Sequence, residues 1–262
     1  MKKAILYFLI FAGISVVMTL GIIFLVGFFS RPEICEAVGM ERTSVFLTVY
    51  LSMVVLWAIL IIFIFTRCRY ASLSFGNLTG NNRWTIVLLS FFIFLAFYLP
   101  TVWVRSQIVP HDVEALANLQ LYQSHPFMSL TILGLFYTTI QLVSLGAIMR
   151  EVLPICRTPW IPILVIASLQ AIPNWGDGGA LGITSVIFAI ISGSMEGWLY
   201  YYTRSIWPAV LGELFADFIL WMFLDNAPPA FLAVAGLIAF PFAGYLMIRK
   251  IYGYQPVGYE AA

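Results

Sequence analysis

Long apolar runs, separated by short polar segments, dominate the hydrophobic pattern of this chain. A bilayer core about 30 Å thick needs about 20 residues of helix to cross it. The fifth run is short and carries Pro162 and Pro173, which makes it the weakest of the set. The runs that we interpret as transmembrane helices cover residues 4–29, 44–66, 84–104, 127–148, 159–175, 181–203, 205–224 and 230–248. The pattern therefore predicts an all-α, polytopic membrane helix bundle of about eight transmembrane helices.

The polar segments divide the chain into three predicted parts. Residues 1–126 hold the first three helices and an outer loop, residues 127–250 hold the last five helices as a core, and residues 251–262 form a cytoplasmic tail. The loop from 105 to 126 is the longest polar excursion and is too short to form a domain. We expect it to lie as an interfacial helix.

Composition supports the membrane interpretation and excludes a soluble domain. Hydrophobic residues make up 62% of the chain and charged residues only 10%, whereas a soluble domain has about 25% charged residues. No basic run is present that would bind nucleic acid. The first apolar run, 4–29, is much longer than the core of a signal peptide, which has about 7–15 residues. We therefore interpret it as a retained first helix.

The positions of Lys and Arg predict the orientation in the membrane. With the N-terminus inside, ten of the 13 cationic residues fall in inner segments and three fall in outer loops. Cytoplasmic loops carry an excess of Lys and Arg. This bias predicts that both termini are cytoplasmic, in a protein of the plasma membrane. An arrangement of six spans, with the fifth and sixth runs merged into a re-entrant element, keeps the same bias.

Three acids fall inside predicted spans: Glu196, Glu213 and Asp217. An ionisable side chain at membrane depth costs at least about 2.5–3.5 kcal/mol, so each needs a partner or a role. Glu213 and Asp217 are four residues apart and share one helix face. At about 1.5 Å per residue, Gln141, Gln170, Glu196 and Glu213 lie about 10–15 Å from the predicted cytoplasmic edge. We expect a polar pocket there that opens toward the cytoplasm, with Asp217 one turn deeper.

One simpler interpretation remains open beside a functional pocket, namely that these polar side chains only hold the helices together. Amides and carboxyls of neighbouring membrane helices also cross-link them through hydrogen bonds worth about 0.6–2 kcal/mol. The two histidines, His111 and His125, lie in the outer loop, so no histidine is available in a span as a zinc ligand or a general base. The sequence has no phosphate-binding loop and no HExxH motif, and it predicts neither a metal site nor a cofactor.

The segment Gly197–Leu211 carries a family resemblance. It reads Gly-Trp-Leu-Tyr-Tyr-Tyr-Thr-Arg-Ser-Ile-Trp-Pro-Ala-Val-Leu. This resembles a segment of the CPBP family of intramembrane proteases, which includes the CAAX proteases and the bacteriocin-processing enzymes. In that family, Gly-x-Leu-Tyr and then Thr-Gly-Ser-Leu-Trp-Pro lead into a His-x-x-x-Asn motif. Glu213 and Asp217 stand at the positions of that His and that Asn.

The other two family motifs are weaker in this chain. Gly146–Glu151 resembles the run that follows Glu-Glu-x-x-x-Arg, which places the Glu pair at Ile140 and Gln141 and the Arg at Leu145. The Phe-x-x-x-His motif falls near Leu169–Asn174, with Pro173 or Asn174 at the His position. The resemblance covers residues 127–224. It implies a CPBP-like core with a cavity that opens to the cytoplasm, in which the activating Glu, the Arg and both His are replaced.

Three functions follow as hypotheses, and whether the chain is an enzyme stays open among them. The first is a degenerate protease, or pseudoenzyme, that acts in binding, immunity or scaffolding of membrane peptides. The second is an active intramembrane endopeptidase. There Glu213 or Asp217 would activate water and Gln141 or Asn174 would donate to the oxyanion, while Glu196, Gln170 and Asn174 would bind a peptide or protein substrate. The third is a transporter whose buried acids carry protons or cations.

Overall fold

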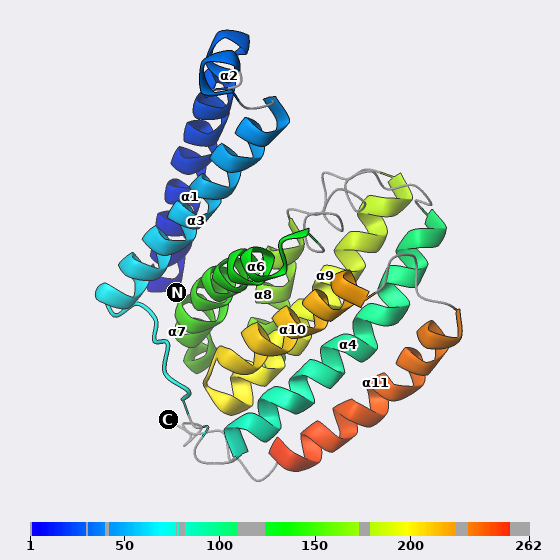
Figure 1. Cartoon of the computed structure of the whole chain (residues 1–262). Coiled ribbons are helices and arrows are strands. Elements are labelled where there is room, and N and C mark those ends of the chain that lie inside the picture. Colours follow the sequence, from blue (N-terminus) through cyan, green and yellow to red (C-terminus); the bar gives the residue numbers. More distant parts are fainter. Residues whose placement is uncertain are drawn as a thin grey trace.

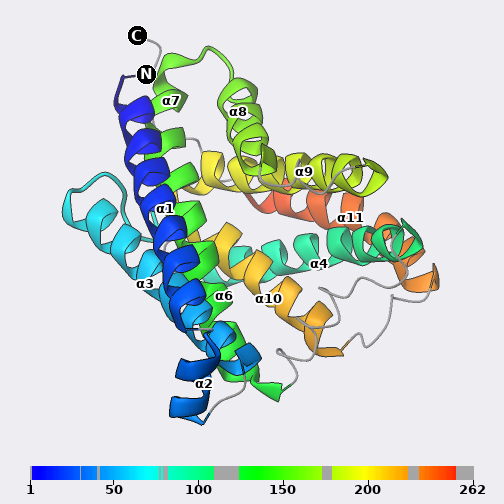
Figure 2. The same cartoon turned by 90° about the horizontal axis from the view of Figure 1, so that it is seen from above.

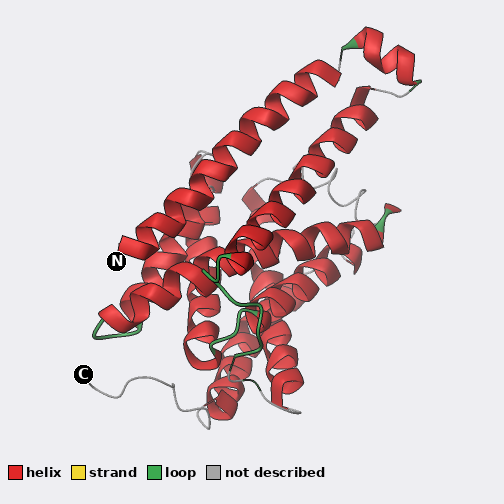
Figure 3. Ribbon diagram, turned by 90° about the vertical axis from the view of Figure 1, so that its left-hand side faces the viewer, coloured by secondary structure: helices red, strands yellow, loops and turns green. Residues whose placement is uncertain are grey.

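A computed structural model of the chain describes residues 2–29, 31–39, 42–76, 78, 82–108, 124–172, 179–223 and 230–251. Every regular element in these ranges is a helix, as Figure 3 shows by colour. The α-helices are α1 (Lys2–Phe29), α2 (Pro32–Val38), α3 (Arg42–Arg67), α4 (Asn82–Ile108), α6 (Pro126–Gln141), α7 (Arg150–Val152), α8 (Trp160–Ala171), α9 (Gly179–Thr203), α10 (Trp207–Phe223) and α11 (Ala230–Ile251). A π-helix, η1 (Leu142–Met149), and a 3-10 turn, η2 (Leu153–Ile155), complete the set.

The predicted all-α bundle is confirmed, and its apolar helices indicate a bilayer environment. Five stretches are helical, apolar and long enough to cross a membrane: Lys2–Phe29, Thr48–Arg67, Arg83–Val104, Pro126–Ile155 and Gly182–Thr203. Trp160–Ala171 and Ala230–Leu246 are shorter apolar helices. The helix that carries Glu213 and Asp217, α10, has 17 residues. The count of eight spans therefore stays a prediction, as does the division of the chain at residue 126.

Large apolar side chains on the outside of the bundle support the same environment. Phe24 on α1 is 71% exposed, and Ile238 on α11 is 69% exposed. In water such surfaces would drive aggregation, because contiguous apolar patches on soluble monomers are limited in size. In a bilayer the same apolar side chains would contact apolar lipid tails.

Neighbouring helices in the bundle are mostly remote in sequence. α1 lies along α3 in both Figure 1 and Figure 2, and α1 also contacts η1. α6, η1 and α7 follow one another without a break, so they form a single long helix. α4 lies between α10 and α11 and packs against both, while α8 packs against α9. The middle of the bundle is therefore lined by α4, the long α6–η1–α7 helix, α8, α9 and α10.

Close contact between α8 and α9 depends on two glycines in a Gly-x-x-x-Gly spacing, Gly193 and Gly197. A Cβ atom added at Gly193 would lie 2.8 Å from the Cα atom of Ala167 and would overlap Oε1 of Gln170. A Cβ added at Gly197 would lie 3.3 Å from side-chain atoms of Ile163. Membrane helices associate through such small residues because their backbones can then approach closely. This contact brings the Gln170 side chain against the backbone of α9.

The turn between α9 and α10 fixes where α10 begins. Arg204 has a φ of 53°, in the left-handed region that glycine favours. The backbone N–H of Ser205 donates to Oγ1 of Thr203 at 3.3 Å, and the N–H of Trp207 donates to Oγ of Ser205 at 3.3 Å. The Trp207 indole donates to the backbone oxygen of Leu73 at 2.7 Å. The first two bonds close the turn, and the indole bond joins the start of α10 to the segment that follows α3.

Candidate functional site

A continuous set of side-chain hydrogen bonds lies in the middle of the bundle. We call it the central polar cluster. It joins side chains of α4, α6, η1, α8, α9 and α10, from residue 98 to residue 213 of the chain. Its members are Tyr98, Gln141, Ser144, Gln170, Glu196 and Glu213.

Glu213 on α10 accepts hydrogen bonds at both carboxyl oxygens. The Tyr98 hydroxyl donates to Oε1 at 2.6 Å, and Nε2 of Gln141 lies 3.4 Å from Oε2. The first distance is that of a short bond to a carboxyl oxygen, whereas the second is at the long limit for a hydrogen bond. The Glu213 residue is only 7% exposed, so bonds within the protein replace its hydration.

Gln170 on α8 links the other half of the cluster. Its amide nitrogen Nε2 donates to Oε2 of Glu196 at 2.7 Å. The same nitrogen lies 3.3 Å from Oγ of Ser144 and 3.5 Å from Oε1 of Gln141. Glu196 on α9 is 3% exposed and Gln141 is 2% exposed, so both depend on these contacts.

The carboxyl groups of Glu196 and Glu213 lie near enough to interact with each other, which brings the two halves of the cluster together. The sequence pairs Glu213 with Asp217 on one helix face, whereas the structure places Glu196 against Glu213.

Asp217 lies one turn beyond Glu213 and is half-buried. The Tyr137 hydroxyl of α6 donates to its Oδ2 at 3.1 Å. The two acids of α10 therefore share a face, as predicted, but each binds a different tyrosine. Asp217 borders the central polar cluster rather than closing it.

The structure brings together four of the six predicted site residues and places a fifth beside them. Gln141, Gln170, Glu196 and Glu213 meet in the central polar cluster, and Asp217 borders it. Asn174 lies outside the described residues. Leu145, at the position of the family's Arg, is fully buried among apolar side chains.

Tyr98, Tyr137 and Ser144 belong to the site or its border, and the sequence pattern did not point to them. Each is a hydroxyl inside a predicted apolar span. A hydroxyl at membrane depth needs a hydrogen-bond partner, so the criterion applied to carboxyls and amides would have found these three as well.

The π-helix η1 also went unpredicted. All eight of its residues, Leu142–Met149, are buried. A π-helix inserts an extra residue per turn and is frequent at functional sites. Here it lies next to Gln141 and brings Ser144 within 3.3 Å of the Gln170 amide.

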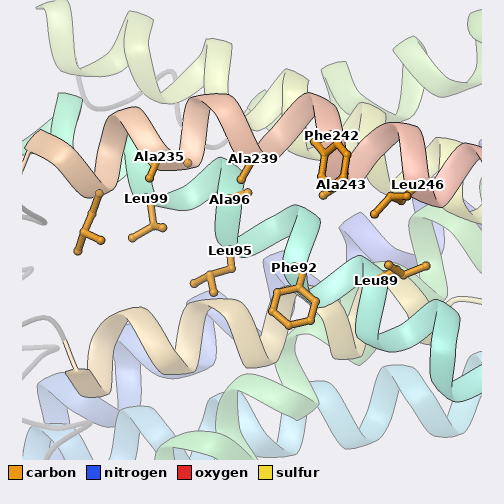
Figure 4. Close-up of a pocket in the computed structure, with 12 residues that line it drawn as sticks. Leu89, Phe92, Leu95, Ala96, Leu99, Ala235, Ala239, Phe242, Ala243 and Leu246 are labelled. Carbon is orange, nitrogen blue, oxygen red and sulfur yellow. The ribbon is translucent and has the colours of Figure 1, made fainter.

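Two hollows in the described structure lie away from the cluster. One is a groove of about 350 Å³ between α4 and α11, lined only by apolar side chains such as Phe92, Ala239 and Phe242 (Figure 4). The other, of about 510 Å³, lies where α1 begins and η2 ends. No member of the central polar cluster lines either hollow, so neither is the pocket expected at the cluster. Within the described ranges, no three His, Cys, Asp or Glu side chains gather as a metal site would require.

Comparison with protein-family models, with curated proteins and with solved structures finds no match to this chain. The likeness to the CPBP family therefore rests on the residues named above.

Proposed function

We propose that this chain is a membrane protein with a CPBP-like core that binds membrane peptides, for scaffolding or immunity, and does not cleave them by the family's mechanism. The observation that carries the proposal is the closure of the central polar cluster by its own side chains. Glu213 accepts from Tyr98 and Gln141, and Gln170 donates to Glu196. We place the protein in the plasma membrane with both termini in the cytoplasm.

Peptide hydrolysis needs a base with a lone pair free for water and a group that stabilises the oxyanion. Both oxygens of Glu213 already accept hydrogen bonds from the protein. The position that would hold the family's Arg is Leu145, buried in the apolar core. A cluster in which Glu213 is held by Tyr98 and Gln141, and in which Leu145 supplies no cation, suits a structural centre better than a hydrolytic one.

Two features of the structure support the resemblance on which this proposal draws. Gln141, Gln170 and Glu213 come from the three segments that resemble family motifs, and they lie in one cluster. Arg204 stands where the family's third motif has glycine, and its φ of 53° is a conformation that glycine favours.

Cleavage and binding are separable in one reconstituted system. The full chain in phosphatidylcholine vesicles would be incubated with a transmembrane peptide that carries a photoreactive side chain, and with a prenylated CAAX peptide. We expect cross-linking to the transmembrane peptide and no new peptide fragment by mass spectrometry. A fragment that the wild-type protein makes, and that Glu213→Gln abolishes while the control Glu151→Gln does not, would contradict the proposal.

A second candidate function is an intramembrane endopeptidase that uses Glu196 and Glu213 together. The observation in its favour is that these two buried carboxyl groups lie near each other in the middle of the bundle. Aspartic proteases use two carboxyls that share one proton, one acting as base and the other as acid. This candidate requires that Glu196→Gln and Glu213→Gln each abolish cleavage. Loss in only one of the two variants would exclude a paired mechanism.

A further inference from the structure

The hollow at the start of α1 is distinct from the central polar cluster and has a different chemistry. It has a volume of about 510 Å³ and is lined by Lys2, Lys3, Arg150, Glu151, Pro154 and Ile155. Figures 1 and 2 both show the start of α1 beside α7, so residues at opposite ends of two long helices meet there. Ligand pockets commonly measure about 300–1,000 Å³, so the hollow is large enough for a small polar group.

Positive charge dominates this hollow. Three cationic side chains face a single carboxylate, which leaves an excess of two positive charges. Nη2 of Arg150 lies 3.6 Å from Oε1 of Glu151, and these side chains are 41% and 23% exposed. An ion pair at that distance and exposure is weak. Arg150 therefore keeps donors free for an anion.

The position of the hollow indicates which anion it fits. It lies at the end of two stretches long enough to cross a bilayer, Lys2–Phe29 and Pro126–Ile155. Such an end falls at the boundary between lipid tails and headgroups. Ile155, which is 57% exposed, and Pro154 form an apolar wall beside the cations. A ligand with a phosphate and an adjoining apolar part satisfies both surfaces.

We propose that this hollow binds the phosphate of an anionic phospholipid headgroup, with Lys2, Lys3 and Arg150 as its partners and Ile155 against the start of the acyl chains. A cation near a membrane surface contributes about a fivefold gain in affinity for an anionic lipid. Basic hollows between membrane helices bind headgroups in this way. Glu151 opposes the anion and also competes for Arg150.

The test is a titration of the full chain in neutral detergent with dioctanoyl phosphatidylglycerol, followed by intrinsic tryptophan fluorescence or native mass spectrometry. Dioctanoyl phosphatidylcholine carries the same chains without net charge, and inorganic phosphate tests the free anion. We expect saturable binding of the anionic lipid at least tenfold tighter than of the neutral one. Arg150→Gln and Lys3→Gln should each weaken it about fivefold.

Two further variants make the test specific to the hollow. Arg67→Gln removes an exposed cation at the end of α3, outside the hollow, and should leave the affinity unchanged. Glu151→Gln should tighten binding up to about fivefold, because it removes the opposing charge and releases Arg150. Gel filtration of each variant checks that it remains folded.

Four outcomes of these measurements would overturn the proposal. Equal affinity for the two lipids, equal weakening by Arg67→Gln and Arg150→Gln, or weaker binding by Glu151→Gln would each overturn it. Inorganic phosphate that competes as effectively as the lipid would assign the hollow to a soluble phosphate anion and overturn the lipid assignment. None of these results depends on whether the chain binds or cleaves peptides.

Discussion

The contact between α8 and α9 is tight enough that one methyl group should disrupt the central polar cluster. In Gly193→Ala the new Cβ would lie 2.8 Å from Cα of Ala167 and 3.2 Å from its Cβ, and would overlap Oε1 of Gln170. Overpacking of this kind costs about 1–3 kcal/mol. Displacement of Gln170 would also break its bond to Glu196, worth about 0.6–2 kcal/mol between membrane helices. We expect a loss of about 2–4 kcal/mol of unfolding free energy.

Two other glycines provide matched controls for the same substitution. Nothing lies within 4 Å of a Cβ at Gly13 on α1, so Gly13→Ala should be neutral or stabilise its helix by up to about 1 kcal/mol. In Gly197→Ala the new Cβ would lie 3.3 Å from Ile163, so the stability of this variant should lie between those of Gly13→Ala and Gly193→Ala. Adding Gln170→Ala to Gly193→Ala should recover part of the loss, because it removes one of the two overlapping groups.

The assay is reversible unfolding in mixed detergent micelles with increasing dodecyl sulfate, followed by tryptophan fluorescence. The expected order of stability is Gly13→Ala above Gly197→Ala above Gly193→Ala. Equal stability of Gly193→Ala and Gly13→Ala would contradict this prediction, because it would mean that α8 and α9 are not in close contact at Gln170.

Three further substitutions test individual bonds by the same unfolding assay. Tyr98→Phe removes the 2.6 Å bond to the buried Glu213 and should cost about 1.5–3 kcal/mol; an unchanged stability would show that the bond is absent. Arg204→Gly should be more stable than Arg204→Ala by about 1 kcal/mol, because both lose the contact with the Tyr201 ring but only Ala keeps the strain of a positive φ. The reverse order would contradict the left-handed turn. Trp207→Phe should lower the unfolding free energy by about 1 kcal/mol, because it removes the 2.7 Å indole bond to Leu73. An unchanged unfolding free energy would show that the start of α10 does not make this contact.

Hydropathy predicted the helices well because it depends only on residues close in sequence. The first predicted run, 4–29, corresponds to α1 (Lys2–Phe29), and the sixth, 181–203, to α9 (Gly179–Thr203). Depth along a helix follows from the rise per residue alone. Sequence position was therefore enough to predict that Gln141, Gln170 and Glu196 lie at one level of the bundle, where the structure joins them.

The partners of each side chain depend on how each helix is rotated about its axis, and the sequence does not encode this locally. Glu213 lies against Glu196 of another helix, although the sequence pairs it with Asp217 on its own. Tyr98 was not singled out, because its ring fits an apolar run and only its hydroxyl indicates a polar role.

The proposed function depends most on hydrogen bonds between side chains of the central polar cluster that lie on different helices. A double-mutant cycle between Gln170→Ala and Glu196→Ala measures this directly in the unfolding assay. We predict a coupling free energy of about 0.6–1.7 kcal/mol for this pair, as for other hydrogen bonds between membrane helices. The same cycle between Gln170→Ala and Glu33→Ala, on α2, should give none. Equal coupling in the two cycles, or none in either, would contradict the cluster and the proposed function that rests on it.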